Sequence, residues 1–268
     1  MLRISGTGES HVGLVRANNE DAAFLGPTCM LVADGVGGGA AGEVASASTA
    51  YAVAATALAR SGDDPAAILR DAIALAQSQI RAGVVADPER TGMATTLTAV
   101  VTDGTSFALA HLGDSRGYVF RDGDLTRVTH DHTYVQELLD EGRLDDLAAA
   151  HHPWRNVVLR SVNGSEEGSP DILALFLRPG DRILLASDGL TDLVDEAAIA
   201  EILAQRSDDD AVGALVAAAL GRGGRDNVTC LVATIVDGPA ISADGMLFGA
   251  VRDPANVIDL AAVRTASA

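Results

Sequence analysis

Residues 29–43, with the sequence CMLVADGVGGGAAGE, limit most strongly how this chain can fold. The apolar run 29–33 indicates a buried strand, which ends in the carboxylate of Asp34 and a glycine-rich turn before an alanine-rich helix. A strand that ends this way places an acid at the rim of a sheet. The same arrangement recurs at Asp188, after the apolar run 182–186. We therefore expect two acids to meet at one site.

The remaining pattern predicts antiparallel sheets with helices packed outside them. Asp-Gly pairs between apolar runs favour hairpins, and helical periods flank those runs. The expected strands are 2–5, 12–15, 29–33, 95–101, 106–112, 117–121, 172–177, 182–186 and 228–236, with 172–177 and 182–186 forming a hairpin. The expected helices are 42–60, 65–82, 133–142, 195–204 and 208–220. We interpret this order as one α+β domain with an irregular insertion at 143–170 and a tail at 238–268.

Composition excludes several classes of protein. The 268 residues include 48% hydrophobic side chains, which is enough for a core. The formal net charge of -18 argues against binding nucleic acid or an anionic membrane surface. No apolar run approaches the ~18–20 residues of a membrane span. The two cysteines, Cys29 and Cys230, lie in apolar runs, and no secretory signal precedes the first strand, so we expect a cytoplasmic protein.

Acidic residues gather at predicted strand ends and tight turns. These are Glu20, Asp34, Asp114, Asp188 and Asp226. Each alone is more often part of a plain turn. Packed together they would repel one another, and a divalent cation such as Mg²⁺ or Mn²⁺ removes that repulsion because it prefers oxygen ligands. Arg16 lies four residues before Glu20 and is suited to grip a phosphate.

A nucleotide site is the main rival interpretation of the opening stretch. Residues 35–40 fit the pattern G-x-G-x-x-A between a strand and a helix, which is a dinucleotide fingerprint. However, Asp34 would then face a pyrophosphate, and residues 53–60 read as helix where a second strand ending in an acid is required. A P-loop is excluded because no Gly-Lys-Ser/Thr follows.

Six short motifs occur in order along the chain. They are RANNED at 16–21, ADGVGG at 33–38, GMATT at 92–96, GDSR at 113–116, SDGL at 187–190 and RDN at 225–227. Together they resemble the metal-dependent Ser/Thr protein phosphatases, the protein phosphatase 2C family, over residues 4–237. Residues 126–144 and 151–164 are similar to the helix and flap of the bacterial members.

The resemblance implies a fold and a division of the chain. The fold is a four-layer α-β-β-α sandwich, in which two antiparallel sheets are flanked by antiparallel helix pairs. The catalytic domain would span residues 1–237, with a flap insertion at about 143–170, and residues 238–268 would form a C-terminal tail of unassigned role. The metal centre is expected at one end of the sandwich.

The resemblance also implies a ligand set for two ions of Mn²⁺ or Mg²⁺. Asp34 is expected to bridge both ions, and Gly35 to offer its carbonyl to one of them. Asp188 and Asp226 are expected to hold the other ion, while Glu20 binds through water.

Further site residues follow from the same motifs. Asp114 and Asp188 would hold a third, weaker ion. Arg16 would bind the substrate phosphate and act with Asp34 in catalysis. Behind the ligands, Asp21 and Asn227 would form a supporting shell, in which Asn227 orients the preceding aspartate or a metal-bound water.

The implied reaction is hydrolysis of phospho-Ser/Thr by direct attack of a water or hydroxide that bridges the two metals. Val36 stands where some members have His, so we expect a metal-bound water to protonate the leaving group. Ala94 replaces a Gly, and residues 156–164 diverge from the usual end of the flap, which leaves substrate preference open. No metal ligand is lost, which argues against an inactive member.

The expected partners are phosphorylated proteins, namely a bacterial Ser/Thr kinase and its substrates, with no nucleic acid and no membrane span. We expect a monomer. Two alternatives remain open: a partner-switching phosphatase of the same fold that regulates a sigma factor, and an inactive adaptor that binds phosphoproteins.

Overall fold

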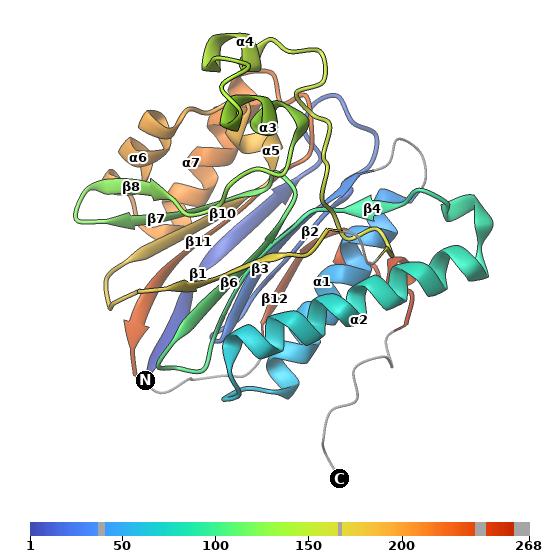
Figure 1. Cartoon of the computed structure of the whole chain (residues 1–268). Helices are drawn as coiled ribbons and strands as arrows, with labels where there is room; N and C mark the ends of the chain where they lie inside the picture. Colours follow the sequence, from blue (N-terminus) through green and yellow to red (C-terminus); the bar gives the residue numbers. More distant parts are fainter. Residues whose placement is uncertain (37–40, 166–167, 239–244, 260–268) are drawn as a thin grey trace.

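Two antiparallel sheets lie face to face in the computed structural model, which describes residues 1–36, 41–165, 168–238 and 245–259 (Figure 1). The first sheet has five strands in the order β1 (Leu2–His11), β11 (Val228–Asp237), β10 (Arg182–Ala186), β7 (Arg116–Arg121) and β8 (Asp124–Arg127). The second has the order β12 (Met246–Gly249), β2 (Asp21–Leu25), β3 (Cys29–Val36), β5 (Leu97–Thr102), β6 (Phe107–Leu112) and β9 (Asp171–Leu175), and β4 (Ala94–Thr95) pairs with β3.

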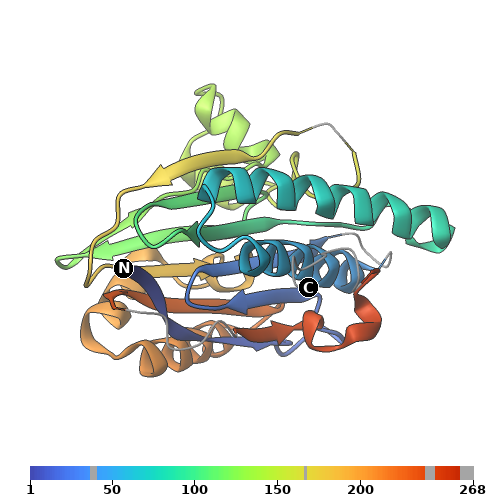
Figure 2. The same ribbon diagram turned by 90° about the horizontal axis from the view of Figure 1, so that it is seen from below.

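Helices cover the outer face of each sheet, as Figure 2 shows from below. The second sheet carries α1 (Gly42–Ala59) and α2 (Pro65–Ala86), and the first carries α6 (Glu196–Gln205) and α7 (Asp208–Gly221). Shorter helices are η1 (Pro88–Arg90), α3 (Tyr134–Asp140), α4 (Asp146–Ala150), α5 (Asp188–Thr191), η2 (Ala250–Arg252) and η3 (Pro254–Asn256). The expected α+β sandwich is therefore confirmed.

The apolar run of β3 is explained by burial on both of its faces. Leu31 points into the core beneath α1 and α2, whereas Met30 and Val32 point into the core between the sheets. Successive side chains of a strand face opposite ways, so a central strand with two covered faces has no polar alternation.

The predicted start of α2 is also confirmed. The Asp64 carboxylate accepts hydrogen bonds from the backbone N–H groups of Ala66 and Ala67, and Pro65 occupies the first helical position. An acceptor at the N-cap satisfies N–H groups that have no partner inside the helix.

Several expectations about the strands were wrong. Residues 12–15 lie outside β1, which ends at His11, and β2 occupies residues for which no strand was expected. Residues 172–177 and 182–186 do not form a hairpin, because β9 pairs with β6 in one sheet and β10 pairs with β7 and β11 in the other. The turn at 113–115 likewise joins β6 to β7 across the two sheets. Local turn residues signal a reversal but not which sheet receives the next strand.

Residues 245–259, here called the C-terminal strap, pack against the domain although the sequence shows no period there. β12 pairs with β2, and Val251 and Val257 are buried in the core cluster of α1 and α2. The Ser48 hydroxyl of α1 donates to the carbonyl of Asn256 and accepts from the backbone N–H of Ile258. The strap therefore covers one edge of the second sheet, while residues 239–244 and 260–268 of the expected tail lie outside the described residues.

Across the described ranges, none of the helices is both long and apolar enough to cross a membrane.

If the C-terminal strap belongs to the folded unit, weakening its buried contacts should destabilise the whole domain. We expect the double variant Val251→Ala/Val257→Ala to lower the free energy of unfolding by about 2 kcal/mol, because buried methyl groups are lost. Urea denaturation followed by circular dichroism measures this. Val85→Ala makes one such truncation at an exposed side chain and should change the value by less than about 0.5 kcal/mol. Equal unfolding midpoints for all three proteins would contradict docking of the strap.

Candidate metal centre

The predicted site residues meet at one end of the sandwich. A cavity of ≈ 210 Å³ opens there, and its wall includes Arg16, Glu20, Asp34, Gly35, Asp114, Asp188, Asp226 and Asn227. These residues come from the β1–β2 connection, β3, the β6–β7 turn, the start of α5 and the segment before β11. Asp21 does not line the cavity and is fully buried behind it. The fold thus brings together residues that are distant in the sequence.

Asp34 is fixed in place by the two threonines of the GMATT motif. Its backbone N–H donates to the Thr96 hydroxyl at 2.9 Å, and its carbonyl accepts from the Thr95 hydroxyl at 2.8 Å and from the Thr96 N–H at 2.9 Å. The Thr96 hydroxyl also lies 2.7 Å from the Ser115 hydroxyl. The strand that carries Asp34 is therefore tied to the turn that carries Asp114.

Close backbone approach explains the glycine that follows Asp34. A Cβ on Gly35 would lie 2.5 Å from the carbonyl oxygen of Gly42 and 2.8 Å from that of Glu20. A Cβ on Gly42 would in turn lie 2.6 Å from the Glu20 carboxylate. No real side chain fits at these distances, so the start of α1 can approach the Glu20 segment only because both positions are glycine.

Asn227 holds the segment that carries Arg16 and Glu20. Its side-chain oxygen accepts from the Glu20 N–H at 2.8 Å, and its amide nitrogen donates to the carbonyls of Val12 and Asn18 at 3.0 and 2.9 Å. Its backbone N–H donates to the Asp226 carboxylate at 2.8 Å. One side chain therefore shapes the β1–β2 connection, although no periodic structure supports that connection.

Asp21 joins the two sheets behind the cavity. It lies opposite Asp34 in the β2–β3 pairing, and one of its carboxylate oxygens accepts from the Ser187 hydroxyl at 2.8 Å. Ser187 precedes Asp188 and accepts from the Thr229 N–H at 3.0 Å. The other Asp21 oxygen is buried without a hydrogen-bond partner in the part of the chain that the structure describes. An unpartnered buried carboxylate oxygen is costly, so burial here disfavours the ionised form of Asp21.

Arg16 is the cation at the edge of the cavity. One of its terminal nitrogens lies 2.6 Å from the Asp226 carboxylate, and this contact raises the pKa of Arg16 above its usual value. The side chain is 52% exposed, so the guanidinium remains open to solvent on its other side.

Burial and mutual repulsion raise the carboxylate pKa values in this region. Burial is the largest cause for Asp34 and Asp188, and neighbouring carboxylates add to it, so both pKa values lie well above the usual range. The same causes raise the pKa of Asp114 to about 7 and burial chiefly raises that of Asp21 to about 6. Burial also raises the pKa of Glu20. Ionising the whole group is unfavourable unless positive charge enters the site.

The donor set fits hard divalent cations rather than soft ones. Carboxylates and a backbone carbonyl line the cavity, and neither histidine nor cysteine is among its described lining residues. Across residues 1–36, 41–165, 168–238 and 245–259, no three Asp, Glu, His or Cys side chains lie close enough together to hold an ion by themselves. Mg²⁺ and Mn²⁺ sites commonly keep several waters as ligands, and a lined cavity leaves room for them.

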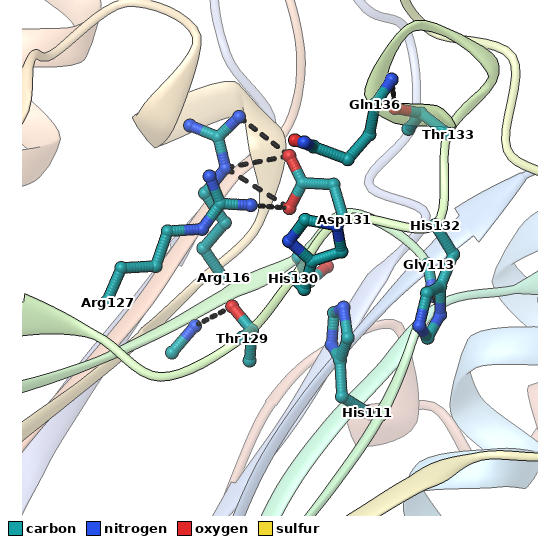
Figure 3. A network of polar contacts seen from close by, with 12 residues as sticks. His111, Gly113, Arg116, Arg127, Thr129, His130, Asp131, His132, Thr133 and Gln136 are labelled. Atoms are coloured by element: carbon teal, nitrogen blue, oxygen red, sulfur yellow. Dashed lines mark hydrogen bonds and ion pairs between the residues drawn. The ribbon is translucent and has the colours of Figure 1, made fainter. Parts of the chain in front are cut away.

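A polar network supports the turn of Asp114 from the flap side, as Figure 3 shows. Asp131 forms ion pairs with Arg116 and Arg127, the first at 2.8 Å. The His132 backbone N–H donates to the Gly113 carbonyl at 2.8 Å, and its Nδ1 accepts from the Gly113 N–H at 3.2 Å. That assignment places the proton on Nε2, which faces Asp171 at 3.1 Å. The 129–133 segment thus acts as a brace for the turn.

Several residues near the site were missed by sequence reasoning. A neighbouring cavity of ≈ 150 Å³ is lined by Asp114, Asp131, Asp188 and Asp192, among others. Asp192 lies four residues after Asp188, and this spacing places two side chains on one helix face, so a signal existed. For Asp131 there was none, because only the tertiary fold brings it beside Arg116.

The chain is similar in sequence to proteins that are already known. The family model described as Protein phosphatase 2C matches residues 7–212. The serine/threonine protein phosphatase PstP of Mycobacterium tuberculosis is 44% identical over 239 residues, which cover 89% of this chain and 46% of that protein. The serine/threonine phosphatase stp of Listeria monocytogenes is 32% identical over 231 residues, covering 82% of this chain and 91% of the relative.

A solved structure matches the fold as well. The crystal structure of the catalytic domain of PstP in complex with two manganese ions has a TM-score of 0.79 and 42% sequence identity, and covers 88% of this chain and 100% of that one. The chain spans about half the length of the mycobacterial relatives that it matches.

The raised pKa values predict how the stability of the cation-free protein depends on pH. In the unfolded chain a carboxyl group ionises near pH 4, whereas Asp21 and Asp114 in the fold keep their protons to about pH 6 and 7. Between these values the folded state binds more protons, so stability falls as pH rises. We expect the Tm in EDTA to drop by roughly 5 °C from pH 5 to 7.5 and then level off.

Saturating Mn²⁺ should abolish most of that drop, and Asp34→Asn should make it shallower in EDTA. Asp124→Asn, an exposed change on β8, is the matched control and should leave the slope unchanged. A Tm that rises with pH over this range in EDTA would show that the carboxylates are not mutually destabilised.

Proposed function

Because the chain belongs to the protein phosphatase 2C family, we propose that it is a metal-dependent phosphoprotein phosphatase that hydrolyses phospho-Ser/Thr. The observation that carries the proposal is the convergence of Glu20, Asp34, Asp188 and Asp226 on one cavity, with Arg16 at its edge. Negative charge gathered beside the accessible guanidinium of Arg16 suits a site for cations and a phosphate together.

The cofactor that we propose is a pair of Mn²⁺ or Mg²⁺ ions. Asp34 and the Gly35 carbonyl would hold one ion, and Asp34, Asp188 and Asp226 the other, with Glu20 acting through water. Asp114 and Asp188 would hold a third, weaker ion. Burial, and after it repulsion between carboxylates, raises the pKa values of Asp34 and Asp188, and this supports the assignment because entering cations would favour the ionised groups. The related catalytic domain of PstP was solved with two manganese ions.

Substrate binding falls to Arg16 in this proposal. Its contact with Asp226 uses one terminal nitrogen, which leaves the other donors of the guanidinium for phosphoryl oxygens. Asp226 and Asn227 fix the direction of this side chain and of the segment that carries it. When bound, the two cations supply a water of lowered pKa and counter-charge for the phosphoryl oxygens.

The cavity offers no histidine to protonate the leaving group. Val36 stands where some family members have histidine, and no histidine is among the described residues that line the cavity. The Val36 side chain cannot donate a proton, so we propose that the leaving oxygen takes its proton from water.

Phosphorylated proteins, including a Ser/Thr kinase and its substrates, are the proposed partners. A cytoplasmic location and a monomeric state remain predictions from the sequence.

The first test is metal-dependent turnover. We expect hydrolysis of p-nitrophenyl phosphate and of phosphothreonine peptides with Mn²⁺ or Mg²⁺, and no turnover in excess EDTA. Asp34→Asn should lower kcat by at least about a hundredfold while the far-ultraviolet circular dichroism is retained, because one ligand to both ions is weakened. Asp124→Asn should keep normal kcat. Full turnover in EDTA would exclude the two-metal reaction, whereas tight phosphopeptide binding without turnover would favour the adaptor.

The role of Arg16 predicts a loss of phosphate affinity. Arg16→Ala should lower kcat/KM for phosphopeptides by roughly 10- to 100-fold, because a charge-assisted hydrogen bond to an oxyanion contributes about 1.5–3 kcal/mol. Inorganic phosphate should also inhibit this variant less strongly. The matched control is Arg206→Ala, a change on an exposed arginine after α6. An unchanged inhibition constant for phosphate would remove Arg16 from the phosphate site.

A further inference from the structure

A second and larger cavity adjoins the candidate site beneath the flap. Its volume is ≈ 560 Å³, and it shares Asp188 and Asp226 with the first cavity. Asn156 lines both and so marks their junction. Figure 1 shows the flap helices α3 and α4 above α5, which contributes to the floor of this cavity. A group bound here would therefore lie beside the reacting phosphate.

Two arginines bring unpaired positive charge to the wall of this cavity. Arg155 comes from the flap after α4, and Arg225 comes from the segment between α7 and β11. Neither guanidinium forms a hydrogen bond or a salt bridge with any residue that the structure describes, and both residues are exposed. In a chain of net charge -18, two uncompensated cations that face one cavity need an explanation.

The third arginine in the wall, Arg116, differs from these two because it already pairs with an acid. Arg116 is held by the Asp131 carboxylate at 2.8 Å and is half-buried (Figure 3). Its charge is compensated within the fold. Arg155 forms no ion pair with Asp192, whose pKa is raised by burial, and its positive charge offsets that rise only in part. Arg155 and Arg225 are therefore the wall's available donors.

The acids of the cavity wall would not neutralise the positive charge of Arg155 and Arg225 when cations are bound. Asp188 and Asp226 are the proposed ligands of the divalent cations, so their charge would be neutralised when the cations are bound. Of the described acids in this wall, Asp192 alone then remains. The loaded cavity would be positive, which is complementary to an oxyanion.

We propose that Arg155 and Arg225 form a subsite for an anionic side chain of the substrate, next to the phosphorylated residue. This inference rests on the proposed function. The ligand is an oxyanion, supplied either by the carboxylate of Glu or Asp or by a second phosphorylated residue. Guanidinium groups bind both through paired hydrogen bonds. In an extended peptide the side chains of residues i and i+2 lie on the same side, so we place the anion two residues from the scissile phosphate.

The test compares phosphothreonine peptides that differ at one position. One peptide is uncharged around the phosphothreonine, a second carries Glu two residues away, and a third carries a non-hydrolysable phosphonate there. Placing the anion on the N-terminal or the C-terminal side gives two versions of each. With Mn²⁺ present, we expect kcat/KM to be about tenfold higher for an anionic peptide than for the neutral one, equivalent to about 1.4 kcal/mol.

Arg155→Ala and Arg225→Ala should each reduce this preference, and the double variant should abolish it while leaving kcat/KM for the neutral peptide within about twofold. Arg143→Ala on the flap and Arg222→Ala after α7 remove the same charge outside the cavity and should keep the preference. Arg155→Lys and Arg225→Lys should each retain part of the preference, because the positive charge remains although the fork of donors is lost.

A binding measurement separates this proposal from the proposed function. Fluorescence anisotropy with a peptide that carries a phosphonate at the central position and Glu two residues away should show about tenfold weaker binding to the double variant. If no peptide is hydrolysed, the proposed function fails, yet this measurement still tests the subsite. A preference for Glu and phosphonate alike, or for phosphonate only, supports the subsite and identifies the source of the anion. Equal kcat/KM for all peptides, or an equal loss on neutral and anionic peptides, would overturn it.

Discussion

Repulsion among buried carboxylates is the constraint on which this structure depends. Asp34, Asp114 and Asp188 are buried in one wall, and burial chiefly, with repulsion from neighbouring carboxylates, raises the pKa of each. A chain free to relax would separate them. The fold prevents this by attaching each acid to a different rigid element, and hydrogen bonds from neighbouring hydroxyl and amide groups then fix the attachments. The fold therefore keeps these acids together despite their repulsion.

The hydroxyl and amide groups around the acids explain why short motifs, and not isolated acidic residues, identify the site in the sequence. Thr96 links the strand of Asp34 to the turn of Asp114 through Ser115. Ser187 links Asp21 on one sheet to the start of β11 on the other. Each is a small side chain that can donate and accept at once. Replacing any of them with an apolar residue would leave a buried polar partner unsatisfied, which costs more than the hydrogen bond itself contributes.

Local signals in the sequence predicted the antiparallel sheets, the outer helices and the acids at strand ends, whereas the four-layer sandwich followed from the family resemblance. The cap at Asp64 and the apolar run before Asp34 depend only on neighbours in the chain. The failures have a different origin. β9 and β10 carry strand signals and a turn between them, but their partners are chosen by packing across the whole sheet. The C-terminal strap is held by Ser48 and by pairing with β2, which no period within the strap reveals. Likewise, the roles of Asp131 and Arg155 depend on neighbours that only the tertiary fold brings beside them.

The distribution of cations connects the scaffold to the site. All 19 basic residues are arginine, so every cation in this chain offers a planar fork of donors. Where that fork meets a buried acid, as Arg121 meets Asp181 and Arg116 meets Asp131, it serves the scaffold. The brace at 129–133 then links this scaffold to the flap, since Thr133 pairs with Val158 close to Arg155. One short segment therefore lies between the flap that carries Arg155 and the turn that carries Asp114, and it contacts both.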